Sequence, residues 1–208
     1  MRRVLVMLLS AGVLVCASAS ASVIFMTGNH PQANEENILF NGAGLIAGPA
    51  MQVTGQLNQS GFVVSFQCTE NLITPSAGQA RVEAQDGAFT DLAISLVGGV
   101  FTDVIFNLNI ANGLSGTASV TANEFGGGAS TFTFPVDGSG SNFLTILANG
   151  GTLISSVAIT GTAPITDIRQ IRVSGATTPP AVVPEPASFA LVGGALAGLY
   201  ALLRRRRP

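Results

Sequence analysis

The sequence predicts an all-β fold, an antiparallel β-sandwich or jelly roll of about ten strands. Apolar and polar residues alternate through much of residues 22–175, and glycine-containing turn signals separate these stretches. No apolar run in this region has helical spacing. A period of two with one apolar face is typical of half-buried strands. We therefore expect one β domain over residues 22–175.

Residues 1–21 have the pattern of a secretory signal peptide. Arg2 and Arg3 precede an apolar run over residues 4–15, and small residues with A-x-A spacing follow it. The apolar run is too short to cross a bilayer, which needs about 20 residues. We expect cleavage after Ala21, with Ala19 as the second-best site.

Two other export signals are weaker interpretations of the same segment. A lipoprotein signal would use Cys16, but Val15 stands before it where a small residue is expected. A twin-arginine signal would use Arg2 and Arg3, but only one residue precedes them and the apolar run is very hydrophobic. General secretion is the favoured interpretation.

The strands expected in the body follow from stripes of alternating residues. The longest stripe places six residues on one face and three polar residues on the other: Val100, Thr102, Val104, Phe106, Leu108 and Ile110 against Asp103, Asn107 and Asn109. Shorter stripes lie at residues 62–66, 92–96 and 153–159. The last strand is expected at residues 168–173, where the alternation slips between Ile168 and Ile171 and indicates a bulge.

Seven turn signals separate these strands at intervals of 11 to 14 residues. They are Asp86-Gly87, Gly98-Gly99, Asn112-Gly113, Gly126-Gly127, Asp137-Gly138, Asn149-Gly150 and Thr160-Gly161. Glycine and asparagine supply the positive φ angles that tight hairpin turns need. The sequence therefore predicts hairpins at these positions.

The C-terminal part contains a proline-rich stalk, a short acidic motif and an apolar segment. The stalk covers residues 176–183, and Pro184, Glu185 and Pro186 follow it. Residues 187–203 are 17 residues without a charge, which is the lower limit for a membrane-spanning helix. The cluster Arg204, Arg205, Arg206 and Arg207 ends the segment. Basic flanks stay cytoplasmic, so we expect the body to face outward.

These three parts, in this order, resemble the PEP-CTERM sorting signal of Gram-negative bacteria that make extracellular polysaccharide. The resemblance covers residues 183–208 and does not extend to the body. It implies that an exosortase, an intramembrane cysteine protease and transpeptidase, recognises Pro184, Glu185 and Pro186 and removes the helix. The protein would then be the substrate of that enzyme. The alternative is a permanent single-pass anchor.

The charge distribution excludes one class of partner. All nine basic residues are arginine, and only Arg81, Arg169 and Arg172 lie outside the two ends. Three arginines against eleven acidic residues give the body a net charge of −8. Such a body is repelled by phosphate backbones, so no nucleic-acid partner is expected.

The residue inventory also argues against catalysis. The body has one histidine, His30, and one cysteine, Cys68, and the chain has no lysine. One of each cannot form a zinc site of three or four ligands, and the motifs of serine hydrolases are missing. Cys68 shares the parity of the apolar stripe before it, so we expect a buried, inert thiol. We therefore predict no catalytic residues, no metal site and no cofactor.

The carboxylates leave two chemistries open. The number of acidic residues is large enough for the carboxylate pair that glycoside hydrolysis needs. Most of the acidic side chains, however, fall in turns or on polar faces, where we expect them to be solvated: Glu35, Glu36, Glu70, Glu83, Asp86 and Asp91. The loop from Asp137 to Asn142 is rich in oxygen ligands but lacks the further carboxylates of a calcium motif, which favours a hairpin loop.

The predicted function is that of a secreted, non-enzymatic structural or adhesion protein. We expect an exported precursor anchored in the inner membrane and a mature form at the cell surface or in the exopolysaccharide matrix. The expected partners are an exosortase-like enzyme, the membrane and exopolysaccharide. A carbohydrate-binding module is the alternative, although the body has neither tryptophan nor tyrosine as a sugar platform. Ice binding is disfavoured, since no regular threonine array is visible.

Overall fold

The structure is a computed structural model that describes residues 22–75, 81–138, 140–181, 193 and 196. Within these residues the chain forms eleven β-strands. They are β1 (Ser22–Thr27), β2 (Glu36–Leu39), β3 (Ala50–Leu57), β4 (Val63–Ile73), β5 (Arg81–Ala84), β6 (Phe89–Leu96), β7 (Asp103–Ile110), β8 (Ser115–Glu124), β9 (Ala129–Asp137), β10 (Asn142–Asn149) and β11 (Ile154–Ser174). The all-β prediction is confirmed.

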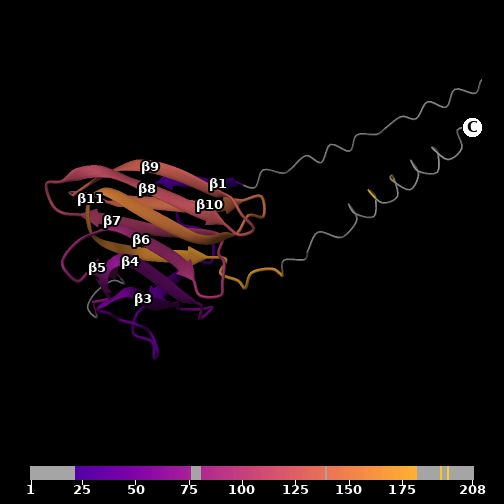
Figure 1. Ribbon diagram of the computed structural model, residues 1–208, viewed down its shortest axis with the longest axis horizontal. Coiled ribbons are helices and arrows are strands. Elements are labelled where there is room, and N and C mark those ends of the chain that lie inside the picture. The colour runs from indigo at the N-terminus through magenta and orange to yellow at the C-terminus, as the bar shows by residue number, and fades with distance from the viewer. Residues whose placement is uncertain (1–21, 76–80, 139, 182–192, 194–195, 197–208) are drawn as a thin grey trace, which may run out of the picture.

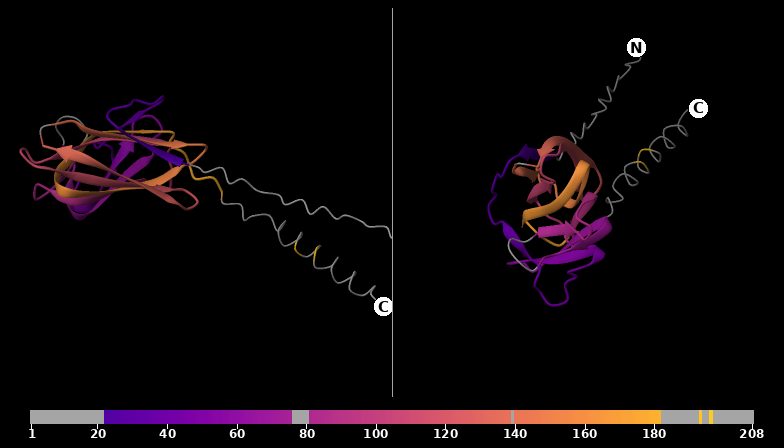
Figure 2. Two further views of the ribbon diagram at one scale, coloured as in Figure 1. Left: turned by 90° about the horizontal axis from the view of Figure 1, so that it is seen from above. Right: turned by 90° about the vertical axis from the view of Figure 1, so that its left-hand side faces the viewer.

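The strands form two layers that share β11, and every pairing is antiparallel (Figure 1). One layer has the order β1-β10-β7-β11. The other contains β9, β8, the first half of β11, β6, β4 and β3. β2 and β5 also pair with the second half of β11 and connect it back to β3 and β4. Seen nearly along the strands, the layers enclose the core (Figure 2, right).

β11 can serve both layers because its register shifts along its 21 residues. Its first half pairs with β6 and β8, and its second half pairs with β7. The predicted turn at Thr160-Gly161 is therefore wrong, since both residues lie inside β11 next to a register shift. The predicted bulge near Ile168 is confirmed by a second shift between Arg169 and Arg172.

The other six turn signals join consecutive strands, but most of them do not make hairpins. Gly126-Gly127 joins β8 and β9, which pair with each other. Five other signals instead connect strands that are not paired with each other: Asp86-Gly87, Gly98-Gly99, Asn112-Gly113, Asp137-Gly138 and Asn149-Gly150. The hairpin prediction is wrong at these five positions. Glycine provides the turn conformation whether the next strand pairs locally or crosses to the other layer.

The core follows the predicted apolar stripes. Its largest fully buried side chains include Phe66, Phe89, Phe101 and Phe106. The stripe on β7 is buried as expected, but so is part of the face that was expected to be polar and exposed. Asp103 is 0% exposed and Asn107 only 6%. A covering loop, described below, explains this difference.

The first and last strands of the body begin and end at one end of the molecule (Figure 1). Ser22 pairs opposite Asn149, and Thr177 forms a bridge with Val100. No helix in the described part of the chain has the length and apolar character of a membrane span. The segment expected to span the membrane, residues 187–203, lies outside the described residues except for Gly193 and Leu196.

Candidate functional site

The outer face of β10, β7 and β11 is covered by the loop of residues 28–35. Thr145 on β10 fastens this loop at two points. Its hydroxyl accepts a hydrogen bond from the backbone N–H of His30 at 3.1 Å and donates to the carbonyl of Gly28 at 2.9 Å. Thr145 itself has no exposed surface. The loop therefore forms part of the folded body and shields polar residues of β7 from water.

Arg172 on β11 contacts both ends of this loop. Its guanidinium lies 2.6 Å from a Glu35 carboxylate oxygen and also donates to Asn29 Oδ1. The Arg172 and Glu35 side chains are only 21% and 11% exposed. A half-buried, hydrogen-bonded ion pair of this kind fixes the guanidinium in one place. Glu35 is thus not one of the solvated carboxylates that the sequence predicted.

The bulge in β11 places Gln170 beside this ion pair. Arg169 pairs opposite Asn107 and Arg172 opposite Ile105, so β11 carries one extra residue here. Gln170 adopts φ of 53°, the left-handed conformation that costs most residues energy. Bulges of this kind redirect a side chain out of the regular alternation. Gln170 consequently faces a groove.

This groove has a volume of about 720 Å³ and is built from segments far apart in the sequence. They are the loop before β2, β2 with the residues after it, the two residues after β4, and parts of β10 and β11. Its lining combines amide side chains, phenyl rings and one guanidinium, namely Asn37, Asn41, Gln170, Phe40, Phe143 and Arg172. The size is typical of a small-ligand site.

The amides of the groove have unused hydrogen-bonding capacity. Asn37 and Asn41 are exposed and Gln170 is partly exposed. None of their three side-chain amides forms a hydrogen bond within the part of the chain that the structure describes. Next to the groove, Asn107 pairs opposite Phe143, and its Oδ1 is buried without a partner among the described residues. The site thus offers several donors and acceptors to a ligand.

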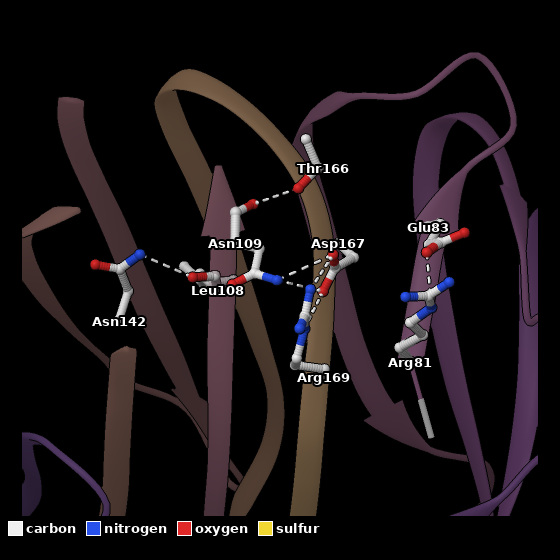
Figure 3. Close-up of polar contacts among 8 residues, drawn as sticks. All are labelled: Arg81, Glu83, Leu108, Asn109, Asn142, Thr166, Asp167 and Arg169. Atoms are coloured by element: carbon white, nitrogen blue, oxygen red, sulfur yellow. Dashed lines mark hydrogen bonds and ion pairs between the residues drawn. The ribbon is translucent and has the colours of Figure 1, made fainter. Parts of the chain in front are cut away.

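A second polar cluster lies where β7, β11 and β5 are neighbours (Figure 3). The Arg169 guanidinium donates to both carboxylate oxygens of Asp167, each at 2.7 Å. Asn109 Nδ2 donates to the same carboxylate at 3.1 Å. On β5, Arg81 Nε lies 2.7 Å from Glu83. Asp167, Arg169 and Asn109 satisfy one another, and Arg81 forms an ion pair with Glu83, so the cluster is structural.

Asp103 is the most unusual titratable group of the body. It is fully buried, and neither carboxylate oxygen has a hydrogen-bond partner within the described residues. Burial raises the pKa of Asp103 to about 6, and the nearby Glu35 carboxylate adds to this effect. The proximity of Ser174 and of the Arg172 guanidinium lowers the pKa by less, although Ser174 Oγ makes no hydrogen bond to the carboxylate among the described residues. Because Asp103 is closed off from solvent, it does not reach the groove.

The two candidate nucleophile partners, Cys68 and His30, lie in different parts of the fold. Cys68 on β4 is 4% exposed, and its thiol donates to the carbonyl of Asp91 at 2.9 Å. Burial raises the pKa of the Cys68 thiol, and the Asp91 carboxylate adds to the rise. The His30 ring contacts the carbonyl of Thr27 at 3.0 Å. The prediction of a buried thiol is confirmed, and a raised pKa disfavours reactivity.

Two further predictions about acidic residues can be compared with the structure. Glu36 is only 8% exposed and its Oε2 accepts hydrogen bonds from the backbone N–H groups of Gln59 and Ser60, so it is not solvated as predicted. Asn142 closes the loop after β9 by bonding to Asp137 through both backbone groups. No group of three or more metal-ligating side chains occurs in the described ranges.

The residues predicted for export and sorting lie outside the described residues. They are Ala19, Ala21, Pro184, Glu185, Pro186, Arg204, Arg205, Arg206 and Arg207. Sequence reasoning did not find the groove, because its residues come from five separate segments. The slip in the alternation before Ile171 was the one local signal, since it marks the bulge that carries Gln170.

Two solved structures resemble the chain weakly. One is a family 11 carbohydrate-binding module from Clostridium thermocellum in complex with a β-1,3-1,4-mixed-linked tetrasaccharide, with 13% identity, a TM-score of 0.32, and coverage of 69% of this chain and 98% of that chain. The other is the family 11 module of the cellulosomal cellulase Lic26A-Cel5E of the same organism, with 9% identity, a TM-score of 0.22, and coverage of 76% and 84%. The fold described above rests on its own strand pairings and not on these likenesses.

The C-terminal segment gives a specific match. No curated protein matches the chain significantly. Residues 182–207, however, match the family described as PEP-CTERM protein-sorting motif. The resemblance seen in the sequence is confirmed, and the C-terminal segment of this chain carries a PEP-CTERM protein-sorting motif.

Proposed function

We propose that this protein is an exported, non-enzymatic structural or adhesion protein, delivered by its sorting motif to the cell surface or to an extracellular polysaccharide matrix. The match over residues 182–207 is the observation that carries this proposal. A chain with such a motif is exported and processed at a membrane by an exosortase-type enzyme. The compact β body is the part that would remain after processing.

The chemistry of the motif fits recognition outside the bilayer. Pro184 and Pro186 fix two φ angles, lack two backbone N–H donors and favour an extended chain. Glu185 is costly to place in lipid, so it holds the motif at the outer surface. An extended acidic segment next to an apolar one is accessible to a membrane enzyme.

The body supports the non-enzymatic part of the proposal. Cys68 is buried with a raised pKa, and Asp103 is closed off from solvent. Glu35 and Glu83 are each engaged by an arginine. A substitution of Glu35 or Glu83 that abolished a measured turnover would contradict this interpretation.

Deletion of Pro184, Glu185 and Pro186 tests the sorting role. We expect the wild type to lose its C-terminal segment and to leave the membrane fraction, whereas the deletion keeps its full mass and stays in the membrane. Processing also removes Tyr200, the one tyrosine of a chain without tryptophan, so the mature body should be almost transparent at 280 nm.

A deletion of equal length in the stalk, Thr178 to Pro180, is the matched control because it leaves the motif intact. It should be processed like the wild type. Identical mass and location for the wild type and the motif deletion would contradict exosortase-type processing and leave a permanent anchor.

A carbohydrate-binding module is the second candidate, and the groove beside Arg172 and Gln170 favours it. Mixed apolar and amide linings are suited to ligands that present both hydroxyl groups and C–H faces. The two candidates are compatible, since a matrix protein that binds its matrix needs such a site.

A further inference from the structure

We propose that the groove lined by β2, the residues after it and the bulge of β11 binds a segment of an uncharged polysaccharide. The inference rests on the proposed surface or matrix location for its biological setting, but the binding itself depends only on the folded body. Four properties of the groove support it: its free amides, its phenyl rings, its fixed shape and its charge.

The free amides suit the hydroxyl groups of a sugar. A side-chain amide presents two N–H donors and a carbonyl acceptor, so it can pair with neighbouring hydroxyls in either direction. Asn37 and Asn41 follow one another around the end of β2, and Gln170 faces them from β11. All three side chains lack hydrogen bonds in the described part of the chain. A polyhydroxylated ligand would satisfy them at once.

The phenyl rings supply the apolar contact that the C–H faces of a sugar ring need. Phe40 and Phe143 line the groove, and both are only partly buried. The Phe40 ring packs against the buried Phe66 ring, with ring centroids 5.7 Å apart. Phenylalanine lacks the polar edge of tyrosine or tryptophan, but in a groove its face can be covered by the ligand. This arrangement answers the objection raised by the missing tryptophan.

The groove is fixed before a ligand arrives. The bulge in β11 sets the position of Gln170, and the contacts to Glu35 and Asn29 hold Arg172. A guanidinium has five N–H donors, so these contacts leave others for a ligand. A site that is already ordered loses less entropy on binding and therefore binds more tightly.

The charge selects against acidic polysaccharides. Within the groove the positive charge of Arg172 is balanced by Glu35 at 2.6 Å. The body as a whole is strongly acidic, so it repels polyanions at long range. An uncharged chain is the ligand that these two facts favour.

Binding to defined polysaccharides tests the inference. The full chain is dissolved in a detergent without a sugar headgroup, because a glycosidic detergent would compete for the groove. Calorimetry and affinity electrophoresis then compare three neutral probes, namely a β-glucan, an α-glucan and a galactomannan, with a polyuronate and with an extended neutral peptide. We expect saturable binding of at least one neutral polysaccharide with a Kd below about 100 μM.

Two groove variants and one control locate the binding. Asn41→Ala removes an exposed amide, and Gln170→Gly removes an amide at a position where φ of 53° suits glycine, so neither is expected to unfold the body. Each should weaken binding about tenfold, the effect of one lost hydrogen bond. Gln85→Ala removes an amide from a separate small pocket and should leave the Kd unchanged.

Several outcomes would overturn the inference. They are the absence of saturable binding to all neutral polysaccharides, tighter binding of the polyuronate or the peptide, and an equal effect of Gln85→Ala and the groove variants. Circular dichroism of each variant separates lost binding from lost folding. The sorting test above reads mass and location, so its result is independent of this one.

Discussion

Asp103 shows how one buried residue can make the stability of the whole body depend on pH. Its carboxylate has no exposed surface and no hydrogen-bond partner among the described residues. Burial raises the pKa from 3.8 to about 6. The folded state therefore holds a proton more tightly than the unfolded state. The free energy of unfolding therefore falls as the pH rises from about 4 to about 6, because the buried carboxyl group loses its proton. Above about pH 6 the buried charge destabilises the folded state by its full amount.

Asp103→Asn should stabilise the protein at neutral pH. The amide has nearly the same shape but no charge to bury, so the cost of ionisation disappears. A shift of about two pKa units corresponds to roughly 3 kcal/mol at most. Urea unfolding should show a higher midpoint for the variant at pH 8 and no difference at pH 4.

Asp86→Asn is the control, because Asp86 is exposed in the turn before β6. Its unfolding curve should match the wild type at both pH values. An Asp103→Asn variant that is less stable than the wild type at pH 8 would show that an unseen cation or donor satisfies this carboxylate.

A carboxylate on β2 helps to hold the turn of the β3–β4 hairpin in place. Glu36 on β2 accepts hydrogen bonds from the backbone N–H groups of Gln59 at 2.8 Å and Ser60 at 2.6 Å. Burial opposes ionisation, but these hydrogen bonds outweigh it and lower the pKa of Glu36. Asn58 adds a reciprocal pair of bonds to Asn37, each 3.0 Å long. The same contacts position β2 at the groove.

Glu36→Gln should destabilise the body by about 1–3 kcal/mol at pH 7, because it replaces a charged acceptor with a neutral one. Because the pKa of Glu36 is lowered in the folded state, its ionised carboxylate stabilises the fold above the pKa of the unfolded chain, which is near 4.5. This stabilisation is lost as the pH falls below that value. The difference between variant and wild type in urea unfolding should therefore shrink on acidification. Glu70→Gln, on an exposed side chain of β4, should have no effect at either pH; a loss as large as that of Glu36→Gln would contradict the assignment.

The local pattern of apolar and polar residues predicted where strands lie better than it predicted which strands pair. The stripe from Val100 to Ile110 contains the strand β7, Asp103–Ile110, because alternation is a property of neighbouring residues. Whether Asn112-Gly113 closes a hairpin or crosses to the other layer depends on contacts far along the chain. The burial of Asp103 was unpredictable for the same reason, since the loop that covers it begins more than 70 residues earlier.

The groove was hidden from the sequence because tertiary pairing creates it. Asn37 and Gln170 are distant in sequence, and both line the groove because β2 pairs with the end of β11. The sorting motif is the opposite case. Its information lies in consecutive residues, which is why Pro184, Glu185 and Pro186 could be recognised without any structure.

At the scale of the whole molecule, both predicted membrane-directed segments attach at one end. Ser22, the first residue of β1, pairs with Asn149, and Thr177, just after β11, forms a bridge with Val100. β1 begins and β11 ends at the same end of the body (Figure 1). A precursor held at the membrane by either segment would therefore present the same end of the body to it. Removal of one segment would leave the orientation set by the other unchanged.

The scarcity and placement of basic residues predict resistance to trypsin. Arg81, Arg169 and Arg172 are the basic residues of the described body, and each forms an ion pair with an acidic side chain. All three also lie within paired strands, so their backbones do not fit a protease that needs an extended, unpaired chain. Cleavage must wait for local or global unfolding.

We expect the native body to survive trypsin at concentrations that cut the urea-unfolded chain within minutes. As urea increases, cleavage should begin after Arg81, because β5 has only four residues, and should reach Arg169 and Arg172 only when β11 unfolds. Mass spectrometry of the fragments gives the order, and Arg81→Gln should remove the early cut without changing the later ones. Early native-state cleavage after Arg169 or Arg172 would mean that the second half of β11 is not held in the sheet, and the groove that depends on its bulge would then not be a stable feature of the protein.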